Sequence, residues 1–298
     1  MTASAIARTV AFAQGKGGVG KTTCTTNVAG LAALIPGIRV LVVDLDPQGN
    51  VARDLGYEPD SGERLHDALL TSNTPLPILK NVRDSLDVVP GGPHVGFLPD
   101  YFAARARQGV GGFAEALRAG LERIADQYDL ILIDTPPGDR VIVDGVFSVV
   151  RSIVIPTRSD DASIDGVERI AERFVHVRES NPQLTLAGVV LFAVGASATR
   201  LEERVRTTLE AMLDGAAPVF NSRIREQSGA AADARRHGML VHELEANAPS
   251  QAERMKALKE GKSSVPKFHA RNTSGLATDF ESLTSEILQR VSEIESAN

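Results

Sequence analysis

A glycine-rich run between a predicted strand and a predicted helix is the feature that most limits how this chain can fold. The run reads Gly-Lys-Gly-Gly-Val-Gly-Lys-Thr over residues 15–22 and fits the pattern G-x-x-x-x-G-K-[ST]. An apolar run at 10–13 precedes it, and a helical pattern at 21–34 follows it. This order of strand, loop and helix is typical of phosphate-binding loops in α/β sheets.

Apolar runs alternate with helical patterns along the chain to about residue 240. The predicted strands are short and nearly all apolar, and they cover residues 10–13, 40–43, 86–89, 130–133, 153–155 and 189–194. The predicted helices cover residues 21–34, 112–126, 163–178 and 200–213. The pattern therefore predicts an α/β fold with a doubly wound, mostly parallel sheet and helices on both faces. Ligands of such sheets gather at the carboxyl ends of the strands.

Bulk charge and cysteine content exclude several classes of protein. The net charge of −6 argues against a protein that coats nucleic acid over its whole surface, although one basic face is compatible with it. Cys24 is the only cysteine, so we expect no disulfide within the chain and no cysteine-held cluster in one subunit. The chain has no apolar run of 18 residues and no signal-peptide core at its start, which predicts a cytoplasmic protein.

The last fifty residues depart from the alternating pattern. Residues 246–274 form a predicted basic loop or insertion, with six Lys and Arg residues between 254 and 271. Residues 275–296 form a predicted helix, whose apolar stripe is expected to dock on the sheet. We therefore expect a single domain over residues 1–298.

The residue types of the glycine-rich loop fit a nucleoside triphosphate with Mg²⁺. Glycines let backbone N–H groups face phosphates, and the helix that begins near Lys21 adds its positive end. Lys21 should reach the β- and γ-phosphates, and the hydroxyl of Thr22 should bind Mg²⁺. Thr23 is expected to donate to the α-phosphate.

Three aspartates follow apolar strands. Asp134 ends the run Leu-Ile-Leu-Ile at 130–133, and Asp44 and Asp46 end the run at 41–43. Carboxylates at the ends of neighbouring strands repel one another unless a cation lies among them. The sequence therefore predicts a metal site beside the loop.

These motifs together resemble the ParA/MinD superfamily of ATPases. The second lysine of the loop, Lys16, is typical of the deviant Walker A motif of that family. The stretch Asp-Leu-Asp-Pro-Gln-Gly-Asn at 44–50 resembles the Walker A′ motif in its ParA form, and Asp-Thr-Pro-Pro-Gly at 134–138 resembles the Walker B and switch region. The resemblance covers residues 9–245.

The resemblance implies roles for individual residues. Lys16 would cross the interface of an ATP-bound homodimer to the partner's phosphates, and Asp46 would position the attacking water. Asp44 and Asp134 would hold Mg²⁺ through its water shell, while Pro156 would form an adenine-side wall. Together with Lys21, Lys16 and Asp46 are the expected catalytic residues. The expected ATP contacts are Gly15, Lys16, Gly17, Gly18, Val19, Gly20, Lys21, Thr22, Thr23 and Pro156.

Within the family, the sequence favours the ParA branch. A lone cysteine disfavours iron–sulfur relatives, and the acidic tail at 292–296 disfavours a membrane-binding helix. About nine residues precede the first predicted strand, so no amino-terminal helix-turn-helix domain is expected. The likeness implies non-specific binding to double-stranded DNA, a ParB-type centromere-binding partner, and association with the nucleoid. Expected DNA contacts are Arg200, Arg204, Arg223, Arg225, Arg235 and Arg236.

Two other functions stay open at this stage. A ParA-like ATPase that positions a protein cargo, such as a chemosensory cluster or microcompartment, would share all of this chemistry. A metabolic P-loop enzyme would need a substrate pocket, for which the sequence shows no residue constellation.

Overall fold

The computed structural model describes residues 4–71, 74–195, 198–247 and 274–297, and within them it has one eight-stranded sheet in the order β3-β4-β2-β5-β1-β6-β7-β8. The strands are β1 (Ile6–Phe12), β2 (Val40–Asp44), β3 (Leu79–Arg83), β4 (Leu86–Val89), β5 (Leu130–Asp134), β6 (Val150–Thr157), β7 (Thr185–Val194) and β8 (Val219–Arg225). All neighbouring strands are parallel except β3 and β4. The predicted fold class is confirmed.

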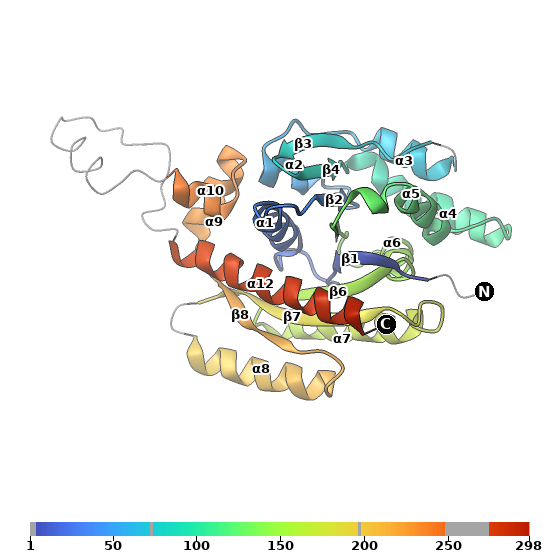
Figure 1. Ribbon diagram of the computed structural model, residues 1–298. Coiled ribbons are helices and arrows are strands. Elements are labelled where there is room, and N and C mark those ends of the chain that lie inside the picture. Colours follow the sequence, from blue (N-terminus) through green and yellow to red (C-terminus); the bar gives the residue numbers. More distant parts are fainter. Residues whose placement is uncertain (1–3, 72–73, 196–197, 248–273, 298) are drawn as a thin grey trace, which may run out of the picture.

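Helices cover both faces of the sheet (Figure 1). One face carries α3 (Glu63–Leu70), α4 (Leu98–Arg107), α5 (Phe113–Glu122), α6 (Arg140–Phe147), α7 (Asp161–Val177) and α8 (Thr199–Leu213). The other carries α1 (Lys21–Ala33), α2 (Asn50–Leu55), α9 (Ser228–His237), α10 (Val241–Ala246) and α12 (Ser274–Ser296). Short 3-10 turns occur at η1 (Pro93–Phe97) and η2 (Ala125–Gln127).

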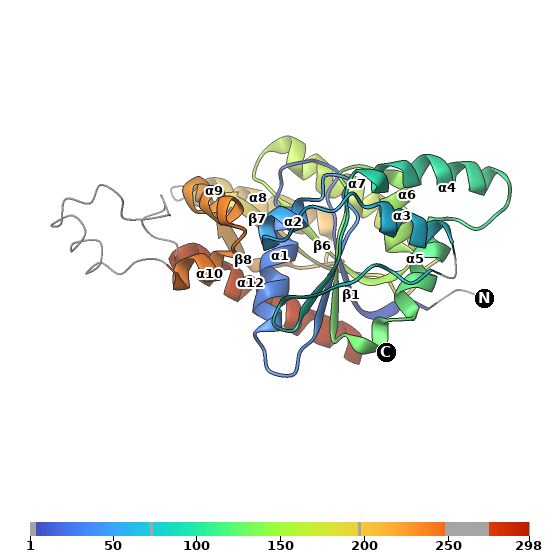
Figure 2. The same ribbon diagram turned by 90° about the horizontal axis from the view of Figure 1, so that it is seen from above.

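The two helical layers enclose separate apolar clusters, because successive strand residues point to opposite faces. In β1, Ala11 packs toward the first face and Val10 and Phe12 toward the second. Figure 2 shows α1, α10 and α12 on one side of the sheet and α4, α5 and α6 on the other. The central strands β2, β5 and β6 are buried throughout, and β1 is buried from Thr9 to Phe12.

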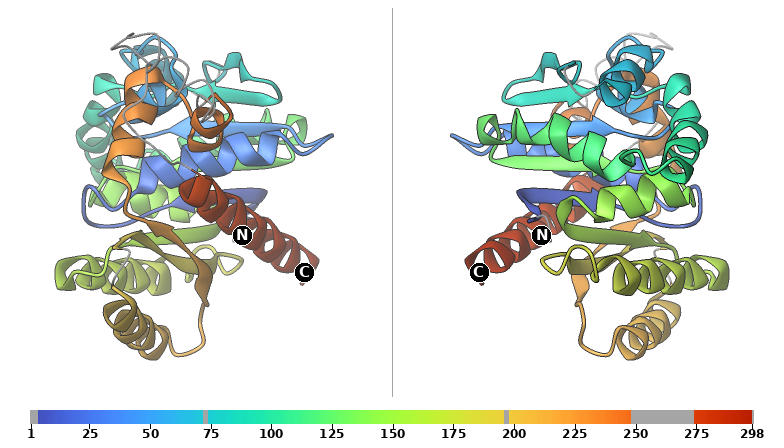
Figure 3. Two further views of the ribbon diagram at one scale, coloured as in Figure 1. Left: turned by 90° about the vertical axis from the view of Figure 1, so that its left-hand side faces the viewer. Right: turned by 90° about the vertical axis from the view of Figure 1, so that its right-hand side faces the viewer.

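The two edges of the sheet were not predicted. β3 is mostly polar and lies at one edge, where an exposed strand needs no apolar run. β8 lies at the other edge and alternates buried and exposed residues from Ser222 to Arg225. That alternation was present in the sequence as a period-two pattern. Figure 3 shows α8 beside β8, at the end of the molecule opposite α3.

The carboxyl-terminal helix α12 buries Phe280, Leu283, Ile287, Val291 and Ile294 against α1 and the sheet. The basic segment at 254–271 lies outside the described residues. No helix among the described residues has both the length and the apolar character needed to cross a membrane.

Candidate nucleotide site

The glycine-rich loop is anchored at its start by Gln14, which follows β1. The Gln14 side chain is buried, and its Nε2 donates to the carbonyl oxygens of Ser163 at 3.1 Å and Pro156 at 3.4 Å. Its Oε1 accepts from the backbone N–H of Gly15 at 2.7 Å. A Cβ on Gly166 of α7 would lie 2.1 Å from that Oε1. Close packing of α7 therefore helps to fix where the loop begins.

The loop turns into α1 through two glycines with positive φ. Gly18 has φ 73° and Gly20 has φ 94°, a region that favours glycine. A Cβ on Gly20 would also lie 2.5 Å from the ring of Phe192 in β7. The helix begins at Lys21, as the sequence predicted.

Lys21 is buried with its charge close to the loop. The residue is only 6% exposed, and its Nζ donates to the carbonyl oxygen of Lys16 at 3.4 Å. Burial lowers the pKa of Lys21, and the carboxylates of Asp134 and Asp46 partly offset that effect. A desolvated ammonium group in this position is suited to bind an anion.

The three predicted aspartates do meet at the carboxyl ends of neighbouring strands. Asp44 and Asp134 are paired in the register of β2 and β5 and are both fully buried. Asp44 accepts from the backbone N–H groups of Asp46 at 3.0 Å and Val51 at 3.4 Å. Asp46 accepts from the N–H of Gln48 at 2.9 Å. The Walker A′ stretch is thus folded around its own carboxylates.

One carboxylate oxygen in this cluster lacks a partner. The hydroxyl of Thr22 donates to Oδ2 of Asp134 at 2.6 Å, while Oδ1 of Asp134 is buried without a hydrogen bond. Burial raises the pKa of Asp134 to about 7, with the Thr22 hydrogen bond and Lys21 acting in the opposite direction. Burial and the neighbouring Asp134 also raise the pKa of Asp44 well above its ordinary value.

The oxygen donors at this place suit Mg²⁺. Within the described ranges, no group of three His, Cys, Asp or Glu side chains is placed to hold a metal ion by itself. Mg²⁺ usually keeps several waters and takes one or two carboxylates together with substrate phosphates. The Thr22 hydroxyl and the unpartnered oxygen of Asp134 fit that requirement, and a cation there would relieve the buried negative charge.

The side chain of Lys16 is held at the start of α7 in this structure. Its Nζ donates to Oδ1 of Asp160 at 2.6 Å and lies 3.4 Å from the hydroxyl of Ser163. Asp160 also caps α7 by accepting from the backbone N–H of Ser163. The hydrogen bond from Lys16 lowers the pKa of Asp160. About two fifths of each charged side chain is exposed, so the pair contributes little to stability.

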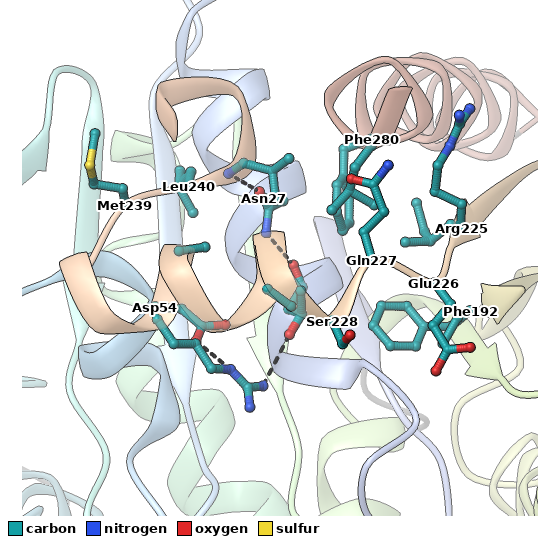
Figure 4. Close-up of a pocket in the computed structure, with 18 of the residues that line it drawn as sticks. Asn27, Asp54, Phe192, Arg225, Glu226, Gln227, Ser228, Met239, Leu240 and Phe280 are labelled. Carbon is teal, nitrogen blue, oxygen red and sulfur yellow. Dashed lines mark hydrogen bonds and ion pairs between the residues drawn. The ribbon is translucent and has the colours of Figure 1, made fainter. Parts of the chain in front are cut away.

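A pocket of about 190 Å³ opens beside the start of α1 (Figure 4). Its walls come from α1, the end of β7 and the segment that joins β8 to α9, and they include Thr23, Asn27, Phe192, Ile224 and Gln227. Oε1 of Gln227 is buried and has no hydrogen-bond partner. Sequence reasoning predicted Thr23 but missed the other four residues, because they come from elements far apart in the chain.

Pro156 does not line this pocket. It is buried inside β6, paired with Val190 of β7, and its carbonyl accepts from Gln14. Its expected contact with adenine stays a prediction.

The six arginines predicted to meet DNA differ in their surroundings. Arg225 forms a two-point ion pair with Asp279 of α12, with both N–O distances at 2.7 Å. Arg223 pairs with Glu202. The remaining four are exposed on two helices, with Arg200 and Arg204 on α8 and Arg235 and Arg236 on α9.

The strand order, the loop and the converging carboxylates define a P-loop nucleotide-binding protein. Residues 7–186 match the family model described as an AAA domain. A ParA family protein of Mycoplasma pneumoniae is 35% identical over 189 residues, which are 59% of this chain and 67% of that protein. The chromosome-partitioning ATPase Soj of Thermus thermophilus is 33% identical over 205 residues, covering 68% of this chain and 76% of the relative.

The chain therefore belongs to the ParA family of ATPases. The fold agrees with that assignment, since the structure of a Cyanothece McdA variant in complex with ATP is similar with a TM-score of 0.71. That likeness has 17% sequence identity and covers 96% of this chain and 97% of the other.

Proposed function

We propose that this chain is a Mg²⁺-dependent ATPase that dimerises on ATP, binds duplex DNA without sequence preference and segregates DNA. The observation that carries the proposal is the cluster of Lys21, Thr22 and Asp134 at the loop. There, a buried ammonium and an unpartnered carboxylate oxygen face the place where a phosphate-binding loop holds its ligand. Each group is suited to one part of a magnesium nucleotide.

The chain's own groups have distinct roles in hydrolysis under this proposal. Loop amides and Lys21 would bind the phosphates, and Thr22 and Asp134 would hold Mg²⁺. When bound, Mg²⁺ neutralises charge on the β- and γ-phosphate oxygens. Asp46 orients a water molecule toward the γ-phosphorus. The water oxygen forms the new bond to phosphorus, the bond to the bridging oxygen breaks, and ADP and phosphate leave.

The Lys16–Asp160 pair provides a way to couple hydrolysis to dimerisation. In the single chain, Asp160 holds the ammonium of Lys16 beside α7. An exposed ion pair of this type contributes about 0–1 kcal/mol, so exchange for a phosphate costs little. In the proposed dimer, Lys16 leaves Asp160 and reaches the partner's nucleotide, where it stabilises charge in the transition state.

DNA contact in this proposal centres on α8. Arg200 and Arg204 are exposed there, and neither forms an ion pair with another described residue. Arginines without a partner are available to bind phosphates, which supply most of the affinity in non-specific DNA binding. Arg223 and Arg225 would first have to leave Glu202 and Asp279.

The cargo is proposed to be plasmid or chromosomal DNA, moved with a ParB-type partner on the nucleoid in the cytoplasm. Relatives at 32–33% identity carry the names chromosome-partitioning ATPase Soj and chromosome partitioning protein ParA, which supports DNA over a protein cargo.

Binding of a random-sequence duplex tests the proposal. The chain should retain the duplex with Mg²⁺-ATP and release it with Mg²⁺-ADP, and retention should fall steeply as salt is raised. A chain that binds ATP but retains no duplex at low salt would contradict the DNA-segregation function while leaving the nucleotide site intact.

A further inference from the structure

Arg235 of α9 lines the pocket beside the start of α1, although the family resemblance implied that it contacts DNA. Its Nη2 lies 3.3 Å from the hydroxyl oxygen of Thr23, which is the second threonine of the phosphate loop. Its Nε lies 3.3 Å from Oδ1 of Asp54 in α2. The guanidinium therefore joins α1, α2 and α9 at one point on the wall of the pocket.

The acidic partner of Arg235 is buried. Asp54 is 5% exposed, and the hydroxyl of Thr26 lies 3.4 Å from its Oδ2. Asp54, labelled in Figure 4, comes from α2, the helix that follows the Walker A′ stretch. A buried carboxylate is costly without a cation, so Asp54 fixes the position of Arg235.

The position of Arg235 matters because Thr23 follows Thr22 at the start of α1. A phosphate bound at the positive end of that helix would lie close to Thr23, whose hydroxyl contacts the Arg235 guanidinium. Half of the Arg235 side chain is exposed, so part of the guanidinium remains available to a ligand. Arginine is well suited to phosphate because its planar group offers several donors.

We propose that Arg235 is a nucleotide-positioning residue that binds the α-phosphate side of ATP and ADP while Asp54 holds it in place. The inference rests on the nucleotide site proposed above and does not depend on DNA or on a partner protein. Because the contact lies at the α-phosphate, it supports ADP and ATP alike.

The test is fluorescence titration of the full chain with ATP and ADP analogues, with Mg²⁺ and without DNA, over a range of salt concentrations. Arg235→Gln should weaken both nucleotides by about tenfold, the size expected for one charge-assisted hydrogen bond. It should also reduce the salt dependence of both affinities. Arg235→Lys, which retains the charge, should recover part of the loss.

Two further variants separate this role from a structural one. Arg235→Gln leaves Asp54 buried without its cation, so the double variant Asp54→Asn with Arg235→Gln removes both charges and relieves that cost. The double variant should fold like the parent and still bind nucleotide weakly. Arg53→Ala is the matched control, because Arg53 is an exposed cation on the same helix as Asp54.

Two results would overturn the proposal. One is parental nucleotide affinity and parental salt dependence in Arg235→Gln, which would remove Arg235 from the nucleotide site. The other is full recovery of nucleotide affinity in the double variant, which would make Arg235 a structural partner of Asp54. If the parent chain bound neither nucleotide, the result would instead contradict the proposed nucleotide site, and it would do so before any variant was compared.

Discussion

The carboxyl ends of the central strands and the β8 edge of the sheet differ in how far their charges are compensated within the chain. At the ends of β2 and β5, Asp44 and Asp134 are fully buried and their pKa values are raised. At the β8 edge, Arg223 and Arg225 are exposed and each has an acidic partner within the chain. The first region is electrostatically incomplete without a ligand, whereas the second is largely neutralised already.

This difference shows which charged residues indicate a functional site. Buried charges without full compensation are expensive, so a chain that keeps them has a ligand to accommodate. Exposed arginines carry no such implication, because surface ion pairs form at little gain or cost.

The largest expected effect is the loss of hydrolysis in Asp46→Ala. Without the carboxylate that orients water, the rate should fall by about 10²–10⁴-fold, the usual contribution of one positioned acid–base group. Nucleotide affinity should stay close to that of the parent. Phosphate release measures the rate, and Asp84→Ala, an exposed aspartate before β4, is the control. Parental hydrolysis in Asp46→Ala would remove Asp46 from the reaction.

Gly20→Ala should be the most damaging change to stability at the loop. The new Cβ would meet Phe192 in a backbone conformation that alanine adopts poorly, at a cost of about 2–4 kcal/mol in the free energy of unfolding. Gly17→Ala is the matched substitution, since a Cβ there meets nothing within 4 Å. We expect it to leave stability unchanged in urea unfolding. Equal stability of the two variants would contradict the packing of Phe192 on the loop.

Asp134 should make the ligand-free chain less stable as pH rises. Its folded pKa of about 7 exceeds the ordinary 3.8, so between about pH 4 and 7 the folded chain holds a proton that the unfolded chain has released. Stability due to this group is present below that window and lost above it. Asp134→Asn should therefore be more stable than the parent at pH 8 by up to about 4 kcal/mol, and should show a smaller fall between pH 5 and 8. An unchanged pH profile in urea unfolding would show that Asp134 is not the titrating group.

The smallest expected effects distinguish arginines that contact DNA from arginines that form ion pairs within the chain. Arg200→Ala and Arg204→Ala should each reduce the slope of log affinity against log salt for random duplex by about 1, the mark of one lost phosphate contact. Arg225→Ala should instead lower stability by about 1–2 kcal/mol, because it removes the cation from Asp279, whose side chain is only 11% exposed. A larger DNA defect in Arg225→Ala than in the α8 variants would place the DNA face elsewhere.

The sequence predicted those parts of the site that are local in the chain. The loop, the two following threonines and the aspartates at strand ends are each specified within a few residues, and the parallel sheet brings the strand ends together. The partners of the long cations could not be predicted in this way. Lys16 and Asp160 are 144 residues apart, and Arg235 and Thr23 are 212 apart.

The elements at the edges of the fold were difficult to predict from the sequence for a related reason. The central strands are apolar because both faces are covered, and this gives a clear pattern in the sequence. β3 and α9 are polar elements at the periphery, and packing against distant segments defines them. The sequence does contain a signal for the end of α9, because Gly238 adopts the left-handed conformation that is typical of the residue after a helix.

Light scattering of Asp46→Ala with Mg²⁺-ATP most directly tests whether this site is half of a two-subunit switch. The 31.7 kDa chain should have the mass of a monomer with ADP and about twice that mass with ATP. Substituting Lys16 in the same background should leave ATP binding in place and weaken the dimer. A chain saturated with ATP that keeps the mass of a monomer would contradict the account.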